Sequence, residues 1–268
     1  MNYKFQDISE QILSYAQPTD IIAPKRFQLG TWNLLAPCWK RLKEGRESEE
    51  KYLWETRQQA SLQYLKAALW DVMFLQEVWF HKDYVKILVA EFTSTYHIYF
   101  LQRVHRKEDG LCILLRKSVF PTPVELIGID FNDFGSRIAL LLIWDEYVML
   151  NTHLTFPHSN QYDNILRMNQ VKKIITILQD FPNRGKVLAG DFNGSIYDPA
   201  VRVLLDEGGL HPMLNHADFL THHSHRGDDM ACDLILSSAD VSIDEVAIDH
   251  LYPHLSDHAL VQASIQVL

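Results

Sequence analysis

The sequence is poor in cysteine, glycine, proline and long apolar runs. Of its 268 residues, three are Cys, 11 are Gly and 10 are Pro. An odd number of widely spaced cysteines argues against a disulfide framework and indicates a reducing compartment: cytoplasm, nucleus, or an organelle after loss of a transit peptide. The low glycine and proline content excludes a collagen-like or disordered chain. The longest apolar run, 138–144, is too short to span a bilayer, so we expect no stable membrane insertion.

Positive charge is also scarce. Lys and Arg number 25 against 34 Asp and Glu, which gives a formal net charge of −9. This argues against a protein that coats nucleic acid through bulk positive charge, but not against an enzyme that meets phosphate through a metal ion. The length suits one large α/β domain or two small ones. Because no Pro/Gly/Ser-rich linker divides the chain, we expect a helix and lead-in at 1–26 and a single domain at 27–268.

The hydrophobic pattern predicts more strands than helices. An amphipathic helix is expected within the first 20 residues, with Phe5, Ile8, Ile12 and Leu13 on one side. Further helices are predicted at 47–69, 83–92, 164–179 and 198–205, and strands at 27–34, 72–75, 96–102, 111–116, 124–129, 137–144, 147–152, 186–189, 234–236, 241–247 and 259–267. Few helices separate the central strands, which favours antiparallel pairing. The predicted α/β fold has two packed, mixed, mainly antiparallel sheets flanked by helices, a four-layer sandwich.

Six short segments place carboxylate, carboxamide or imidazole groups at or just after the end of an apolar strand. They are TWN at 31–33, LQE at 75–77, NTH at 151–153, GDFN at 190–193, DLI at 233–235 and SDH at 256–258. Each segment alone is readable as a turn, a solvated strand end or a structural histidine. Together, their order and their hard oxygen donors favour one catalytic site on a rigid scaffold.

In this order the six segments resemble the endonuclease/exonuclease/phosphatase superfamily of metal-dependent phosphodiesterases and phosphatases, from about residue 27 to the end. NLLAP at 33–37, QEVW at 76–79, DGL at 109–111, FNDFGSR at 131–137 and NTHLTFPH at 151–158 look like a plant and algal branch often described as calcium-binding, near the deadenylase-like members. That branch can carry an EF-hand. No D-x-[DN]-x-[DN]-G loop is present here, so calcium sensing is not carried over.

The resemblance implies roles for eight of these residues. Asn33, Glu77 and Asp257 match the metal side of the family's site, which implies Mg²⁺, with Mn²⁺ or Ca²⁺ as possible substitutes. The residues that match the family's catalytic set are His153, Asp191, Asn193, Asp233 and His258. Asp191 would position or deprotonate the attacking water, and Asp233 would orient His258 for contact with the phosphate or for acid–base work. His153 and Asn193 would hold phosphoryl oxygens.

Three further positions are candidates for substrate binding: Arg137, Asp109 and Thr221. Arg137 is equally readable as a surface salt bridge, and the basic stretch 103–107 before Asp109 as a solvated loop. A histidine cluster could indicate zinc, although a histidine-rich loop beside a phosphate pocket is the better interpretation. The aromatic residues near the motifs are more often core than base-stacking groups. The members of these two sets are His216, His222, His223 and His225, and Trp32, Trp39, Trp79 and Phe80.

We therefore expect a Mg²⁺-dependent phosphoester hydrolase, acting most readily on a phosphodiester of single-stranded nucleic acid or a nucleotide. A lipid or inositol phosphate, as in sphingomyelinase-like relatives, is the alternative substrate class. A catalytically inactive binding module is a third interpretation, which the loss of Glu77, Asp191, Asp233 or His258 would have favoured; all four are present. Four acids in one pocket repel phosphate until a divalent cation enters. The remaining negative charge favours a substrate held at an end or at a few nucleotides.

Overall fold

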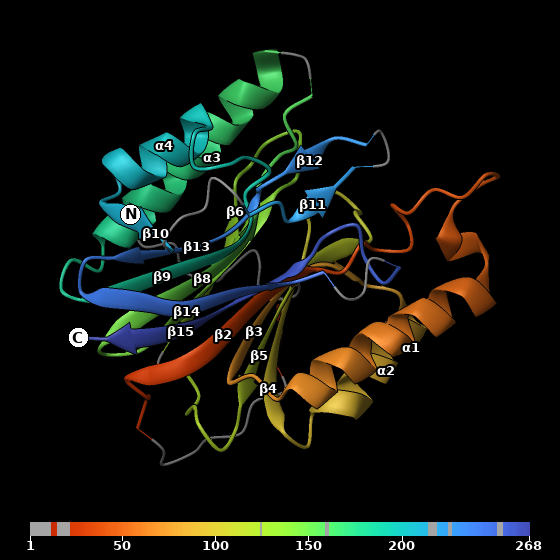
Figure 1. Cartoon of the computed structure of the whole chain (residues 1–268), viewed down its shortest axis with the longest axis horizontal. Helices are drawn as coiled ribbons and strands as arrows, with labels where there is room; N and C mark the ends of the chain where they lie inside the picture. Colours follow the sequence, from red (N-terminus) through yellow and green to blue (C-terminus); the bar gives the residue numbers. More distant parts are fainter. Residues whose placement is uncertain are drawn as a thin grey trace.

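The computed structural model describes residues 12–14, 22–123, 125–158, 161–213, 219–224, 227–250 and 254–268. Within these residues two large sheets pack face to face, and helices cover the outer face of each (Figure 1). This confirms the predicted α/β sandwich. No described helix is long and apolar enough to cross a membrane.

The first sheet has the strand order β1-β4-β5-β3-β2-β15-β14. Its outer face is covered by α1 and α2 (Figure 1). The elements of this half are β1 (Ile12–Ser14), β2 (Arg26–Asn33), η1 (Glu47–Glu49), α1 (Lys51–Ala68), β3 (Val72–Trp79), α2 (Lys82–Phe92), β4 (Tyr96–Gln102), β5 (Asp109–Arg116), β14 (Val241–Asp249) and β15 (Leu260–Val267). Among the described strands of this sheet, only β2 and β3 pair in parallel, because α1 crosses between them.

The second sheet has the order β10-β13-β9-β8-β7-β6, with α3 and α4 outside it. Its elements are β6 (Glu125–Asp130), β7 (Ile138–Ile143), β8 (Tyr147–His153), α3 (Gln161–Gln179), β9 (Gly185–Asp191), α4 (Pro199–Asp206), β10 (Leu210–Pro212) and β13 (Asp233–Ser238). A short hairpin is formed by β11 (His222–His223) and β12 (Asp229–Met230). Here the described parallel pair is β8 with β9, joined through α3. Each half thus has its own β-α-β unit at the centre of its sheet.

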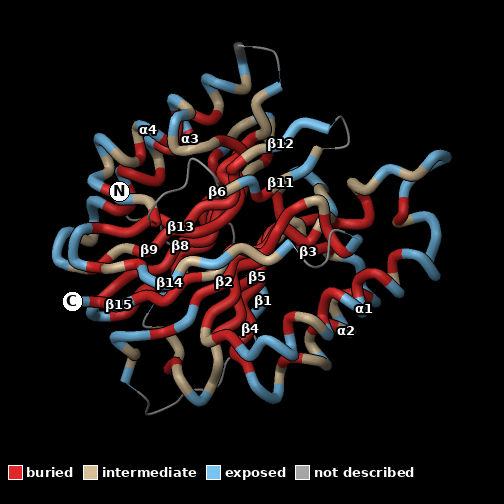
Figure 2. Tube along the Cα trace, in the orientation of Figure 1, coloured by how far each residue is buried: buried red, intermediate tan, exposed pale blue. Residues whose placement is uncertain are grey.

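Three apolar layers hold the sandwich together. The middle layer lies between the sheets and includes Phe74, Ile113, Leu140, Val187 and Ile265, all with 0% exposure. The other two layers lie under the helix pairs. Figure 2 shows the central strands largely buried, whereas the edge strand β14, the outer helix faces and the loops carry exposed residues. Strands buried on both faces explain why their sequences are continuous apolar runs rather than alternating patterns.

The predicted N-terminal helix is wrong where the structure tests it. Ile12–Ser14 form β1, an edge strand that pairs antiparallel with β4. The rest of the predicted helix, within residues 1–11 and 15–21, lies outside the described residues. The short strands β10, β11 and β12 were not predicted, because two or three residues carry no measurable periodicity.

Candidate active site

The site lies where the two central parallel pairs end. Asn33 ends β2 and Glu77 lies near the end of β3, while His153 and Asp191 end β8 and β9. The carboxyl ends of parallel strands meet at one edge of a sheet, and both edges open on the same side of the sandwich. Asp191 pairs in register with His153 on one side and with Asp233 on the other, so these three side chains lie next to each other across three strands.

A cleft of about 710 Å³ opens over these strand ends. It brings together seven of the predicted site residues, together with loop residues 156–158 and residues of the β11–β12 hairpin. The predicted residues that line it are Glu77, Arg137, His153, Asp191, Asn193, Asp257 and His258. Asn33 and Asp233 lie directly behind its wall, since they bond to Asp191 and His258 respectively.

His258 and Asp233 form a buried dyad. The Nδ1 of His258 lies 2.9 Å from Oδ2 of Asp233, and a carboxylate can only accept, which assigns the proton to Nδ1. Burial alone would lower the pKa of His258. The negative charges of Asp233 and Asp191 outweigh it and raise that pKa well above its usual value. His258 is therefore held as a cation with Nε2 facing the cleft.

Asp191 is the hub of the hydrogen bonds in the site. Its Oδ2 accepts from Nδ2 of Asn33 at 3.0 Å, and its Oδ1 accepts from the backbone N–H of Asn193 at 2.8 Å. The same Oδ2 lies 3.4 Å from Nε2 of His153 and 3.7 Å from Nε2 of His258. Burial raises the pKa of Asp191 above its usual value, against the lowering effect of His258. Such a carboxylate is a better base near neutral pH than a solvated one.

His153 and Asn193 flank this hub. Burial, reinforced by the positive charge of Arg137, lowers the pKa of His153 well below its usual value, so its imidazole is neutral. Asn193 has a left-handed backbone with φ of 49°, and its Nδ2 donates one hydrogen bond to the carbonyl of Leu154 at 2.8 Å. Within the described residues the second N–H of that amide makes no side-chain hydrogen bond, so Asn193 is held in place with a donor that can serve a ligand.

Glu77 occupies a strained position on the opposite wall. It has a φ of 50° within a bulge that interrupts the pairing of β3 with β5, and strain of this kind gathers at functional sites. Its Oε2 accepts from the N–H of Ala36 at 3.1 Å. Burial first, and then the charges of Asp109 and Asp257, raise its pKa to about 7. Gathering these carboxylates is costly in the absence of a cation.

The donor set on this side fits a hard divalent cation. Glu77 comes from β3 and Asp257 from the loop before β15, and Oδ1 of Asp257 is buried without a hydrogen-bond partner in the described part of the chain. Asn33 uses its amide oxygen to accept from the N–H of Leu35 at 3.0 Å, which leaves one lone pair. Oxygen donors in small number are what Mg²⁺ takes from proteins.

Arg137 and Asp109 occupy different environments, although both were predicted to bind substrate. Asp109 has 0% exposure, and both of its carboxylate oxygens accept from Nη1 of Arg103 at 3.0 Å. Its carboxylate is thereby committed to a buried ion pair. Arg137 lines the cleft, and its Nη1 is buried without a hydrogen-bond partner among the described residues. Burial and the nearby Arg103 lower the pKa of Arg137 to about 10, which still leaves it charged at neutral pH.

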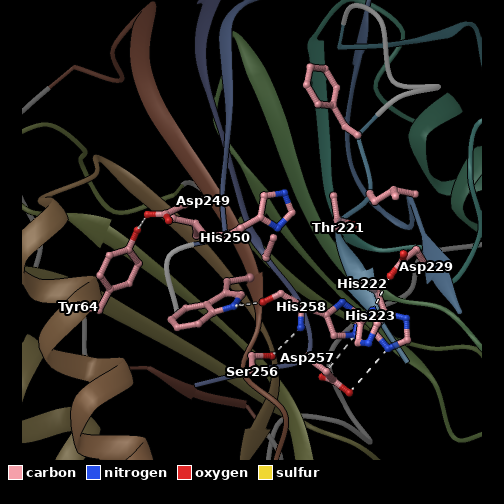
Figure 3. A pocket seen from close by; sticks show the side chains of 15 residues that line it. Tyr64, Thr221, His222, His223, Asp229, Asp249, His250, Ser256, Asp257 and His258 are labelled. Carbon is pink, nitrogen blue, oxygen red and sulfur yellow. Dashed lines mark hydrogen bonds and ion pairs between the residues drawn. The ribbon is translucent and has the colours of Figure 1, made fainter. Parts of the chain in front are cut away.

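Thr221, the third predicted substrate contact, holds the backbone of β13. Its Oγ1 accepts from the N–H groups of Cys232 and Asp233 at 3.1 and 3.0 Å. It also lines a second pocket of about 550 Å³ that adjoins the cleft and shares His222, Asp257 and His258 with it (Figure 3). The hydroxyl therefore positions Asp233, and through it His258.

Four residues that sequence reasoning missed or left unassigned complete the site. Arg57, on α1, donates to the carbonyls of Leu34, Leu35 and Leu255, next to Asn33 and Asp257. Arg167, on α3, donates to the carbonyl of Phe192 at 3.1 Å. The remaining two are Arg103, which pairs with Asp109, and His222, which lies against His258. Of the histidine cluster, His216 and His225 lie outside the described residues, and His223 is exposed.

Comparison with known proteins gives relatives with the same fold. A curated relative, an uncharacterized calcium-binding protein of Arabidopsis thaliana, is 31% identical over 240 residues, which cover 76% of this chain and 49% of the relative. The chain thus spans about half the length of that protein. A Bacteroides vulgatus endonuclease/exonuclease/phosphatase has a TM-score of 0.72 at 19% identity, with 91% of this chain and 100% of that chain covered.

Two further solved structures share the fold at low identity. ANGEL2, a 2′,3′-cyclic phosphatase, has a TM-score of 0.72 at 16% identity, covering 90% of this chain and 96% of that one. The human Nocturnin catalytic domain has a TM-score of 0.70 at 16% identity, covering 96% of each chain. Residues 30–258 match the model of the Endonuclease/Exonuclease/phosphatase family, whose members are metal-dependent phosphoester hydrolases. The chain therefore belongs to that family.

Proposed function

We propose that this protein is a Mg²⁺-dependent phosphodiesterase that hydrolyses nucleic-acid or nucleotide phosphodiesters. The observation that carries the proposal is the convergence in one cleft of the His258–Asp233 dyad, Asp191 and Arg137, whose Nη1 has no hydrogen-bond partner among the described residues. These groups face the carboxylates of Glu77 and Asp257. Two of the structural relatives, by their descriptions, support an anionic substrate: ANGEL2 was seen with adenosine-2′,3′-vanadate and Nocturnin with a sulfate anion.

Glu77 and Asp257, with Asn33 beside them, would hold the cation. A bound Mg²⁺ supplies charge neutralisation at the phosphoryl oxygens and polarises the phosphorus–oxygen bonds. The protein's own task on this side is to keep the carboxylates together and ionised. The N–H of Ala36 holds the carboxylate of Glu77 in place, and the nearby His222 and His258 lower the pKa of Asp257 despite its burial.

The opposite side of the cleft would bind the phosphate and move protons. Arg137 and the neutral His153 present N–H donors to the non-bridging oxygens, where negative charge develops in the transition state. Asp191 would orient the attacking water and accept its proton, because burial has raised its pKa. His258 would contact the phosphate through Nε2 and is protonated to donate a proton to the leaving group.

The test is hydrolysis of bis-p-nitrophenyl phosphate with Mg²⁺ or Mn²⁺. Wild type, Glu77→Ala and His258→Ala are compared, with His223→Ala as the matched control, because His223 is a neighbouring histidine whose side chain is 70% exposed. We expect the first two variants to lose activity and the control to keep it. Equal rates in all four proteins would refute the proposed hydrolytic activity and leave a binding module as the interpretation.

A substrate panel then decides the class of phosphoester. Single-stranded RNA and DNA, an abasic duplex, 2′,3′-cyclic nucleotides, sphingomyelin and inositol phosphates are offered to wild type under the same metal conditions. Preference for short single-stranded substrates or nucleotides supports the proposal. Preference for sphingomyelin or inositol phosphates would replace it with the lipid-directed alternative.

A further inference from the structure

His222 forms a second cluster of metal-binding groups with Asp257 and His258. Its Nε2 lies 3.7 Å from Oδ2 of Asp257, and Nε2 of His258 lies 3.9 Å from Oδ1 of the same carboxylate. The two imidazole rings face each other, with centroids 4.3 Å apart and planes 30° apart. One ligand atom from each residue falls within 4.8 Å of the others. Figure 3 shows the three side chains gathered on one side of the pocket.

The backbone fixes this arrangement. His222 and His258 form an antiparallel bridge between the β11–β12 hairpin and the loop before β15. The N–H of His223 donates to the carbonyl of Asp257 at 2.9 Å, and the N–H of Ala259 donates to the carbonyl of Thr221 at 2.6 Å. Because bonds flank the bridge on both sides, His222 is not free to swing away from Asp257. The three donors are therefore built into position.

The chemistry of the donors differs from that of the Glu77 side. Two imidazole nitrogens and one carboxylate suit borderline transition-metal ions, with Zn²⁺ the most strongly bound of those common in proteins after copper. Glu77 and Asn33 offer only oxygen, which suits Mg²⁺. Donor separations of 3.7 and 3.9 Å are slightly above the roughly 3.4 Å that ligands about 2.1 Å from a tetrahedral zinc ion would adopt. The two distances involve different oxygens of Asp257, and one ligand atom from each residue lies within 4.8 Å of the others, so the three side chains would draw together on binding.

Asp233 adds the support that metal-binding histidines usually have. Its carboxylate accepts a hydrogen bond from the Nδ1–H of His258, so that the neutral form of the ring carries its lone pair on Nε2. The Asp257 side chain is 34% exposed, which gives an ion access, whereas those of His222 and His258 are 10% and 7% exposed. The other cluster of potential ligands, Asp191, Cys232, Asp233 and His258, is buried throughout and offers no such access.

We propose that His222, Asp257 and His258 form a site for a borderline divalent transition-metal ion such as Zn²⁺, a site that shares Asp257 with the Mg²⁺ side but does not use Glu77. An ion there occupies Nε2 of His258, the atom assigned to the phosphate and the leaving group. Filling the site therefore inhibits the enzyme. The binding stands on the geometry alone, whereas the inhibition rests on the proposed function.

The test measures binding directly, with Co²⁺ as a spectroscopic probe and Zn²⁺ as competitor in excess Mg²⁺. Co²⁺ bound by two imidazoles and a carboxylate gives visible absorption bands that are stronger than those of the hexaaquo ion. Wild type, His222→Gln, His223→Gln and Glu77→Gln are titrated, after thermal melts show that each is folded. We expect His222→Gln to weaken Co²⁺ and Zn²⁺ by at least roughly 100-fold, since losing an outer partner alone costs about 10–100-fold.

The two other variants separate this site from its alternatives. His223→Gln makes the same change one residue away, and Glu77→Gln removes the Mg²⁺ side; both should keep the Co²⁺ bands. Unchanged affinity in His222→Gln, or loss of the bands in Glu77→Gln or His223→Gln, would overturn the proposal. Zn²⁺ inhibition is then measured against each protein's own Mg²⁺-dependent rate. If wild type shows no hydrolysis, the proposed function fails while the Co²⁺ titration still decides the site.

Discussion

Arg57→Ala is a substitution for which the structure predicts a large loss of stability. The guanidinium is 6% exposed and pairs with Glu47, which is 3% exposed. Its Nη1 donates to the carbonyls of Leu34 and Leu255 at 3.0 and 2.6 Å, and its Nη2 to that of Leu35 at 2.7 Å. Nε completes the set with a bond to Glu47 at 2.9 Å. One side chain thus satisfies a buried carboxylate and three loop carbonyls.

Removing it leaves a buried charge and three carbonyls without this donor. The remaining cation near Glu47 is Lys40, at 3.1 Å and 29% exposed. Losing one partner of a buried ion pair costs about 3–5 kcal/mol, and we expect the free energy of unfolding to fall by that amount. A half-exposed pair on α4, Arg202 with Asp206, is the control: Arg202→Ala should cost no more than about 0.5 kcal/mol.

The loss should also depend on pH in a defined direction. Although burial favours a higher value, the hydrogen bonds and charge of Arg57, with help from Lys40, hold the pKa of Glu47 below its usual 4.5. A depressed pKa in the folded state stabilises the protein above the unfolded pKa, and that stability is lost as pH falls through the folded value. The difference between wild type and Arg57→Ala should therefore be full at pH 7 and shrink below about pH 4.5.

Unfolding in guanidinium chloride, followed by tryptophan fluorescence, measures both the loss of stability and its dependence on pH. Wild type, Arg57→Ala, Arg57→Ala/Glu47→Gln and Arg202→Ala are compared at pH 7 and pH 4. The double variant should regain part of the loss, because it no longer buries an uncompensated carboxylate. A loss in Arg57→Ala no larger than in Arg202→Ala, or one that grows at pH 4, would refute the reasoning.

Three further substitutions test other parts of the site. Asp233→Asn should reduce kcat by roughly 10²–10⁴-fold. It should also move the limb of the pH–rate profile that reports His258 to lower pH, because the carboxylate that raises the pKa of that ring in wild type is lost. An unmoved limb would contradict the dyad. In thermal melts, Mg²⁺ at 100 times its Kd should stabilise wild type by about 2.7 kcal/mol and leave the stability of Glu77→Gln unchanged. Equal shifts in melting temperature for the two proteins would place the ion elsewhere. Gly190→Ala should prevent folding or lower the free energy of unfolding by more than a strained backbone costs, which is about 1–3 kcal/mol. The reason is that φ is +148° and a Cβ would lie 2.0 Å from the carbonyl oxygen of Thr152. Unfolding in guanidinium chloride like that of wild type would exclude this close approach.

The long elements of the fold were predictable because their sequences carry a strong signal. Strands such as Tyr96–Gln102 and Ile138–Ile143 are buried on both faces, so their apolar runs mark them without tertiary information. β1 was mistaken for a helix because Ile12 and Leu13 also fit a helical spacing. Its strand conformation comes from pairing with β4, a contact between residues about 90 positions apart that local sequence does not encode.

The site was predictable where a motif follows a strand, and not where a side chain acts from a helix. Asp191 and Asp233 end apolar strands, so their proximity follows from the sheet. Arg57 and Arg167 look like solvated helix residues, although a signal was available: Arg57 lies on the same face of α1 as the buried Trp54, Ser61 and Leu65. His222 was visible only as one of several histidines, because its contact with His258 depends on how the hairpin folds over the cleft.

Two buried arginines, Arg57 and Arg167, help to explain how the cleft keeps its shape. In each half of the sandwich, the helix that connects the parallel pair sends an arginine to the carbonyl just beyond a strand end: Arg57 to the residues after Asn33, and Arg167 to the residue after Asp191. Loop carbonyls at these points have left their sheets, and a guanidinium with five donors can satisfy several of them at once. The geometry of the catalytic carboxylates is therefore fixed by the helices as well as by the strands.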